Sequence, residues 1–314
     1  MKKKIVMAAK IAAIAAIAVG LAFLIRDASD HFLAPSYDAG APTAAKFAKI
    51  AKWMPPKSEF EVVADVTRMF SDPAISDRLS KAVGGKGGAV AFFVEALMEK
   101  RSLVGMLMFV GSLGEAGTPP AVAVVAQGSF DEKVMIPAIR AALSSDRPGF
   151  ISEKLGDRTL YAESDERDPF GFVILDREHV AVGMKSSLVA LFGEGPAAAP
   201  APAAFGPADS VIFGRLVFGP RLRAIVPQGF VPAQGVDFQS ADGRNIVARI
   251  PSEEKEAHDL AVFLDGVRSL LILQNEENPV LEGILKGISI RADKQEVAVS
   301  CDVAAVLNLF PPPL

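Results

Sequence analysis

The stretch Gly171-Phe-Val-Ile-Leu-Asp-Arg-Glu-His-Val-Ala-Val-Gly183 decides how the fold is interpreted, because its pattern returns later in the chain. An apolar run, a polar turn and a Val-Ala-Val run are typical of two strands joined as a β-hairpin. The residues that follow, 187–192, predict a short helix. Segment 287–300 repeats the same order and is followed by a second apolar stretch, 304–310. Self-similarity of this kind predicts an internal duplication.

The two related modules are separated by an Ala/Pro-rich segment, 193–208. This composition favours an extended, semi-rigid spacer. Each module opens with an apolar strand, at 60–66 and 210–216. The expected organisation is a membrane anchor at 1–26, a juxtamembrane linker and short helix at 27–56, a first module at 57–192, the spacer at 193–208, a second module at 209–310 and a Pro-rich tail at 311–314.

Each module combines strands with helices. In the first, 103–110 and 121–127 predict strands, and in the second Asp242-Gly243 is typical of a tight hairpin turn between two strands. A helix is expected after Ser252. Its apolar side chains recur at helical spacing, at Ala257, Leu260, Ala261, Leu264, Val267 and Leu271. The predicted fold class is α+β, with two related ferredoxin-like modules, each an antiparallel-rich sheet with helices on one face.

Charge is divided unevenly along the chain. Of its 33 basic and 37 acidic side chains, residues 1–26 hold five basic ones and no acidic one, which leaves 28 basic against 37 acidic in the rest. Surfaces that bind nucleic acid need clustered Lys and Arg to neutralise phosphates. The acidic remainder therefore argues against a nucleic-acid partner.

The N-terminal segment predicts a membrane anchor. Ile5–Ile25 is apolar apart from Lys10, and as a helix it spans about 31 Å, which matches the hydrocarbon core of a bilayer. The preceding lysines predict a cytoplasmic N-terminus in the inner membrane, with the modules exported to the periplasm or cell exterior. The alternative is a cleaved signal peptide, but Phe23–Asp27 fits a cleavage site poorly.

No catalytic, cofactor or metal site is predicted. The cluster Gly84–Gly88 lacks the other residues of a phosphate-binding loop. The three histidines, His31, His179 and His258, lack zinc-site spacing, and His179 is expected at a solvated hairpin tip. Cys301 is expected to be a small buried hydrophobe rather than a nucleophile. The sequence therefore favours a protein that is not an enzyme, and an unrecognised enzyme is the lesser alternative.

Two features suggest binding. Met- and Phe-rich surfaces suit adaptable contacts with protein or lipid, and the candidate surface comprises Phe92, Phe93, Met106, Met108 and Phe109. The competing interpretation is a strand buried on both faces. The candidate docking tail comprises Phe310, Pro311, Pro312 and Pro313. We expect a single-span envelope scaffold that binds other proteins, and the alternative is a carrier of a hydrophobic ligand or lipid.

We expect the full-length chain to remain with the membrane fraction until detergent is added, because Ile5–Ile25 matches the thickness of the hydrocarbon core. Mass spectrometry of the mature N-terminus should find a chain that begins before Arg26. A variant that lacks residues 5–25 is the control and should leave the membrane fraction. A mature wild-type chain that begins after Arg26 and is freely soluble would contradict the anchor.

Overall fold

A computed structural model describes residues 38, 40–56, 58–71, 73, 104–112, 120–128, 130, 150–163, 169–193, 210–217, 235–241, 243–274 and 279–302. The segment Ile5–Ile25, the cluster Gly84–Gly88, the residues Phe92 and Phe93 and the tail 310–313 lie outside this description. Within the described ranges, no helix combines the length and the apolar character needed to cross a bilayer.

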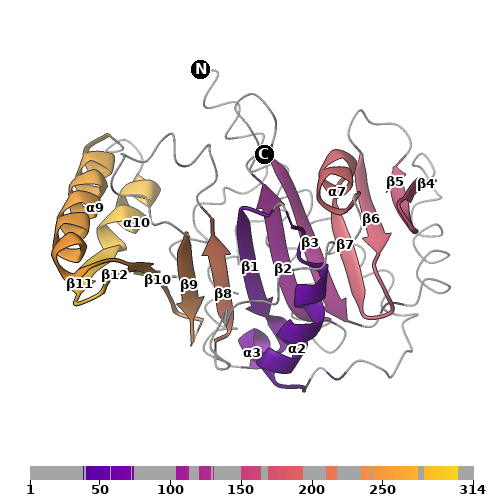
Figure 1. Cartoon of the computed structure of the whole chain (residues 1–314), viewed down its shortest axis with the longest axis horizontal. Coiled ribbons are helices and arrows are strands. Elements are labelled where there is room, and N and C mark those ends of the chain that lie inside the picture. Colours follow the sequence, from indigo (N-terminus) through magenta and orange to yellow (C-terminus); the bar gives the residue numbers. More distant parts are fainter. Residues whose placement is uncertain are drawn as a thin grey trace.

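The described residues form one twelve-stranded sheet with helices packed against it (Figure 1). The strands are β1 (Phe60–Asp65), β2 (Val104–Ser112), β3 (Ala121–Gly128), β4 (Phe150–Leu155), β5 (Arg158–Glu163), β6 (Phe170–Ile174), β7 (His179–Met184), β8 (Ile212–Leu216), β9 (Val236–Ser240), β10 (Asn245–Pro251), β11 (Ser289–Asp293) and β12 (Glu296–Asp302). The helices are α2 (Thr43–Ile50), the 3₁₀ turn η1 (Ala51–Trp53), α3 (Val66–Ser71), α7 (Lys185–Phe192), α9 (Glu254–Gln274) and α10 (Pro279–Gly287).

The strand order is the same in the two halves of the sheet. Across the sheet the order is β11-β12-β10-β9-β8-β1-β2-β3-β7-β6-β5-β4. Outward from the centre, the first half therefore runs β1-β2-β3-β7-β6 and the second runs β8-β9-β10-β12-β11. The first strands of the halves, β1 and β8, pair with each other. The hairpin β4–β5 has no counterpart among the described strands of the second half.

The α+β class and the predominantly antiparallel sheet agree with the sequence-based prediction. The prediction did not include a sheet shared by the two halves. The halves share one continuous sheet through the pairing of Phe60–Ala64 with Ile212–Leu216, which removes two sheet edges that would otherwise be exposed. No described pair of neighbouring strands is parallel, so this sheet does not establish the ferredoxin-like character of the modules.

Helices lie on both faces of the sheet, whereas one face was expected. The face that carries Val63, Met108 and Val125 packs against α2 and α7, and we call it the α2 face. The opposite face carries Val62. It also carries Val299, because residues directly opposite each other on successive strands from β1 to β12 lead from Val62 to Val299. It packs against α3 and α9, and we call it the α9 face.

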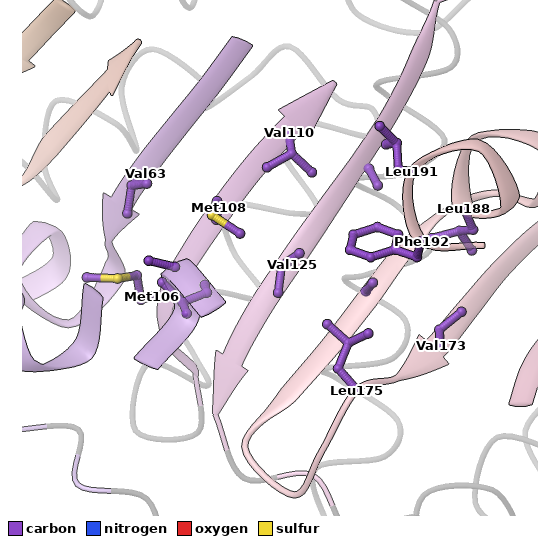
Figure 2. Close-up of a cluster of buried hydrophobic side chains, with 14 of the residues drawn as sticks. Val63, Met106, Met108, Val110, Val125, Val173, Leu175, Leu188, Leu191 and Phe192 are labelled. Carbon is purple, nitrogen blue, oxygen red and sulfur yellow. The ribbon is translucent and has the colours of Figure 1, made fainter. Parts of the chain in front are cut away.

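The largest described core lies under α2 and α7. Figure 2 shows Val63, Met108 and Val125 of neighbouring strands in this cluster, together with Phe192 of α7. Phe47 of α2 meets Phe213 of the second half edge to face, with ring centroids 5.0 Å apart. Helix α2 therefore packs against strands of both halves.

The second half follows its predicted local structure. Gly243 has a φ of 67° between β9 and β10, the left-handed conformation that the Asp-Gly pair predicted. Ala257 and Leu260 of α9 are buried against Val297 of β12. The predicted hairpin is confirmed, and the predicted apolar side of this helix is confirmed from Ala257 to Leu264, whereas Leu271 at its end is 40% exposed.

A buried carboxylate joins α2 to the centre of the sheet. Asp65, at the end of β1, has no exposed surface, and its Oδ1 lies 2.7 Å from the Nζ of Lys46, which is also buried. Its Oδ2 accepts a hydrogen bond from the Thr43 hydroxyl at 2.6 Å. The backbone N–H of Arg68 donates to Oδ1 at 3.1 Å, so Asp65 also caps the N-terminus of α3. Its own N–H donates to the carbonyl of Val211 at 2.8 Å.

Replacing Lys46 with Met should lower the free energy of unfolding by about 3–5 kcal/mol, because the buried Asp65 carboxylate loses its counter-charge. Urea unfolding of the full-length chain in detergent, followed by the fluorescence of its single Trp, measures the effect. Lys49→Met is the matched control. The Lys49 side chain is 50% exposed in its pair with Glu178, so the loss there should be below about 1 kcal/mol. Equal losses in the two variants would contradict the role of Asp65.

Candidate functional site

The α2 face is covered differently in the two halves. In the first half, α2 and α7 pack over it. In the second half, α9 packs on the opposite face, and the α2 face presents charged side chains. We call this surface the charged face, and it comprises Arg215, Asp237, Arg249 and Glu296.

Side chains of alternating charge cross the charged face from strand to strand. Glu61 of β1 lies opposite Arg215 of β8, which lies opposite Asp237 of β9. Asp237 in turn lies opposite Arg249 of β10. The Nε of Arg215 lies 2.7 Å from one carboxylate oxygen of Asp237, and its second nitrogen donates to the other oxygen at 3.2 Å. Arg249 donates to Glu296 of β12 at 2.5 Å.

These charges are accessible to solvent. The side chains of Asp237 and Arg249 are 57% and 51% exposed, and those of Arg215 and Glu296 are 33% and 30% exposed. Exposed ion pairs contribute at most about 1 kcal/mol each to stability. The row is therefore available for contact with another molecule without being a main source of folding stability.

Glu61 ends the row next to the apolar core. Burial raises the pKa of Glu61 to about 7, the positive charge of Arg215 lowers it in part, and the negative charge of Asp237 raises it further. Arg215 compensates Glu61 incompletely because both of its hydrogen bonds with Asp237 hold the guanidinium on that carboxylate. The hydrogen bond with Asp237 also raises the pKa of Arg215.

A second polar group lies at the turn between β6 and β7. The Nδ1 of His179 lies 2.8 Å from Asp176 Oδ1, and the indole N–H of Trp53 donates to Asp176 Oδ2 at 3.2 Å. The Arg158 guanidinium lies 4.7 Å from the centre of the Trp53 ring. Burial alone would raise the pKa of Asp176, but the hydrogen bond and charge of His179, with the other donors, outweigh it and lower the pKa.

His179 is buried, which corrects the expectation of a solvated hairpin tip. Its side chain is 4% exposed, because η1 brings Trp53 alongside the turn that carries it. On the other side it lies opposite Gln127 of β3, which is completely buried. The Nε2 of His179 and both amide atoms of Gln127 have no hydrogen-bond partner among the described residues.

The His179–Asp176 pair resembles the base and orienting group of a nucleophilic site in its geometry only. No described hydroxyl or thiol is hydrogen-bonded to Nε2 of His179, so the nucleophile that such chemistry requires is missing from this part of the chain. The described residues also contain no cluster of three or more groups that could hold a metal ion.

The structure separates the residues of the predicted Met/Phe surface. Met106 and Met108 are completely buried in the core under α2, as the buried-strand interpretation requires. Phe109 points to the opposite face and is partly buried, because successive side chains of a strand alternate. Phe92, Phe93 and the docking tail, Phe310–Pro313, lie outside the described residues.

Cys301 lies partly buried on β12. Burial raises the pKa of its thiol, and the charge of Asp302 raises it further. A raised pKa keeps the sulfur protonated near neutral pH.

Sequence reasoning missed the charged face. Its signal is the alternation of polar and apolar residues in β9, for example Asp237-Phe-Gln. This alternation could have indicated one solvated face. It could not have shown which charges lie opposite each other, because that depends on pairing between distant strands.

Comparison with known proteins provides little guidance. No protein-family model matches the chain, and no curated protein matches it. A solved structure described as "Structure of crystal form I of TP0453" is similar over 83% of this chain and 96% of its own, with a TM-score of 0.40 and 10% sequence identity. Similarity at this level carries no argument about function.

Replacing Glu61 with Gln should remove a pH dependence of stability. Because the folded state raises the pKa of Glu61 from 4.5 to about 7, the protonated form stabilises the fold below pH 4.5. That contribution is lost as the pH rises to about 7. After allowance for the partial exposure of Glu61, the free energy of unfolding of Glu61→Gln should exceed that of the wild type by about 1–2 kcal/mol at pH 8. The two values should be equal at pH 4.5.

Urea unfolding at a series of pH values measures this difference. Glu153→Gln, the same change on the exposed strand β4, is the control and should keep the wild-type slope between pH 4.5 and 8. A Glu61→Gln profile parallel to the wild-type profile would contradict the partly buried, incompletely compensated state of Glu61.

Proposed function

We propose that this chain is a non-catalytic, single-span protein of the cell envelope that binds protein partners on its charged face. One observation carries the proposal: the α2 face is covered by α2 and α7 in the first half, whereas in the second half it presents exposed, alternating charges. The membrane attachment in this proposal rests on the apolar segment Ile5–Ile25.

The arrangement of the charges suits recognition of a folded partner. Neighbouring strands lie about 4.8 Å apart, so a sheet holds successive side chains at fixed spacing. A surface that alternates in sign fits a partner whose charges alternate in the opposite order, and it repels one that is out of register. Such complementarity contributes mainly to specificity, orientation and the rate of association.

In this proposal the chain is a scaffold and neither a carrier nor an enzyme. Met106 and Met108, which belong to the candidate Met/Phe surface, are packed within the core. The unpartnered Nε2 of His179 is buried, so a substrate in solution does not reach it in this conformation.

We also infer that the two halves arose by duplication and then took different roles. Their shared strand order supports this inference, as do the repeated segments 171–183 and 287–300. In this proposal the first half, whose α2 face is covered, provides most of the core. The second half leaves the same face open for binding.

Affinity capture from gently solubilised membranes tests the charged face. The full-length wild type is compared with Arg215→Gln/Arg249→Gln and with the control Lys154→Gln/Lys185→Gln, which removes two positive charges from the first half. A partner should be recovered with the wild type and with the control, and salt should release it. The amount recovered with the Arg215/Arg249 variant should be at least about tenfold lower. Equal recovery with all three proteins would contradict the proposal.

A further inference from the structure

Strand β11 forms one end of the sheet, and its outer edge is unpaired among the described strands. It pairs with β12, and the strand order ends there. The counterpart of β11 in the first half is β6, which pairs with β5 on the corresponding side. Among the described strands, none occupies beside β11 the position that β5 fills beside β6.

The register shows which backbone groups point outward from β11. The N–H of Ser252, at the end of β10, donates to the carbonyl of Gln295 at 2.9 Å. Backbone groups along a strand alternate between its two neighbours. The Gln295 carbonyl points toward β10. The backbone N–H and C=O groups of the next residue, Glu296, therefore point toward β11, and so do those of every second residue after it. Their partners on β11 are Asp293, Arg291 and Ser289. The N–H and C=O groups of Ile290 and Ala292 are therefore directed away from the sheet.

The charges of β11 complement a second copy of the same strand. If two β11 strands pair antiparallel with Ala292 opposite Ala292, then Arg291 of each copy lies opposite Asp293 of the other. Both side chains are exposed. The outward groups of Ala292 form the hydrogen-bonded pair in this register. The Arg–Asp pairs fall at the non-hydrogen-bonded positions, where Cα atoms approach to about 4.5 Å. Centring the pair on Arg291 would instead place two arginines in contact.

Helix α9 packs on one face of the sheet beside this edge. It packs against β11 and β12 at the outer end of the sheet, with α10 on its inner side (Figure 1). Six large apolar side chains are exposed in the described part of the chain, and four of them belong to α9: Val262, Leu270, Leu271 and Leu273. Val262, Leu270 and Leu273 share one stripe with Gly266, which has open space around it. Exposure reaches 60% for Val262 and 63% for Leu273.

We propose that a second copy of this chain docks at this end, with β11 paired antiparallel to β11 and α9 beside α9. A two-fold axis perpendicular to the sheet at Ala292 keeps both α9 helices on the same face of the joined sheet. The contact is isologous and closes as a dimer. It also continues the charged face across both copies. The proposal goes beyond the partner-binding function and does not depend on it.

Disulfide cross-linking of the full-length chain in its membranes tests this contact. Cys301 is first replaced by Ser, which removes the single native thiol, and Ala292→Cys is added. A hydrogen-bonded pair places the Cα atoms about 5.5 Å apart, within the range of a disulfide. Oxidation with copper phenanthroline should give a dimer on a non-reducing gel. Ser152→Cys, on the edge strand β4 at the other end of the sheet, should stay monomeric. A monomeric Ala292→Cys protein, or an equal dimer from Ser152→Cys, would overturn the proposal.

A charge exchange separates the docking contact from any effect on folding. In the Ala292→Cys background, Arg291→Asp and Asp293→Arg each place like charges opposite one another and should lower the dimer yield about fivefold or more. The double variant Arg291→Asp/Asp293→Arg restores opposite charges and should recover the yield. Undiminished yield in the single variants, or no recovery in the double variant, would overturn the register. The charged-face variants leave β11 unchanged, so failure of partner capture and failure of dimerisation are distinguishable.

Discussion

The buried carboxylate of Asp65 is the contact on which the rest of the structure depends. Burying a charge without partners is strongly unfavourable, and here the partners come from separate parts of the chain. Lys46 and Thr43 bring α2 to the sheet, and the Asp65 N–H is bonded to Val211 at the start of the second half. With α2 held there, Phe47 reaches Phe213, and the core of the first half is covered. One side chain thus fixes a helix, a strand end and the junction between the halves.

The junction also explains why the two halves differ in what they expose. Pairing of β1 with β8 covers the edges of the first strand of each half, and it leaves β4 and β11 as the ends of the described sheet. The first half places α2 and α7 on one face, while α9 of the second half packs on the opposite one. The α2 face of the second half is consequently the exposed, charged one. The surfaces proposed for binding partners and for binding a second copy both lie in that half, whereas the most deeply packed core lies in the first.

Local patterns were sufficient where neighbouring residues determine the structure. The Asp242-Gly243 turn, the strands around 104–112 and 121–128, and the apolar side of α9 follow from residues close together in sequence. The hairpin β4–β5 was missed even though Gly156, with a φ of 64°, marks its turn, because half of the residues in its two strands are polar. His179 was placed in solvent because its immediate neighbours are charged. Its burial depends on Trp53, which is distant in sequence.

By itself, the sequence determined the division of charge between a basic apolar N-terminus and an acidic remainder, the repeated order of strands, and the α+β class. These follow from composition and short-range periodicity, which need no knowledge of distant contacts. Only the tertiary structure decided that the halves share one sheet, that Met106 and Met108 belong to the core, and that Arg215, Asp237 and Arg249 form a row. Burial and the pairing of distant strands are set by register and by packing between segments far apart in the chain. No local pattern encodes which strands far apart in sequence become neighbours.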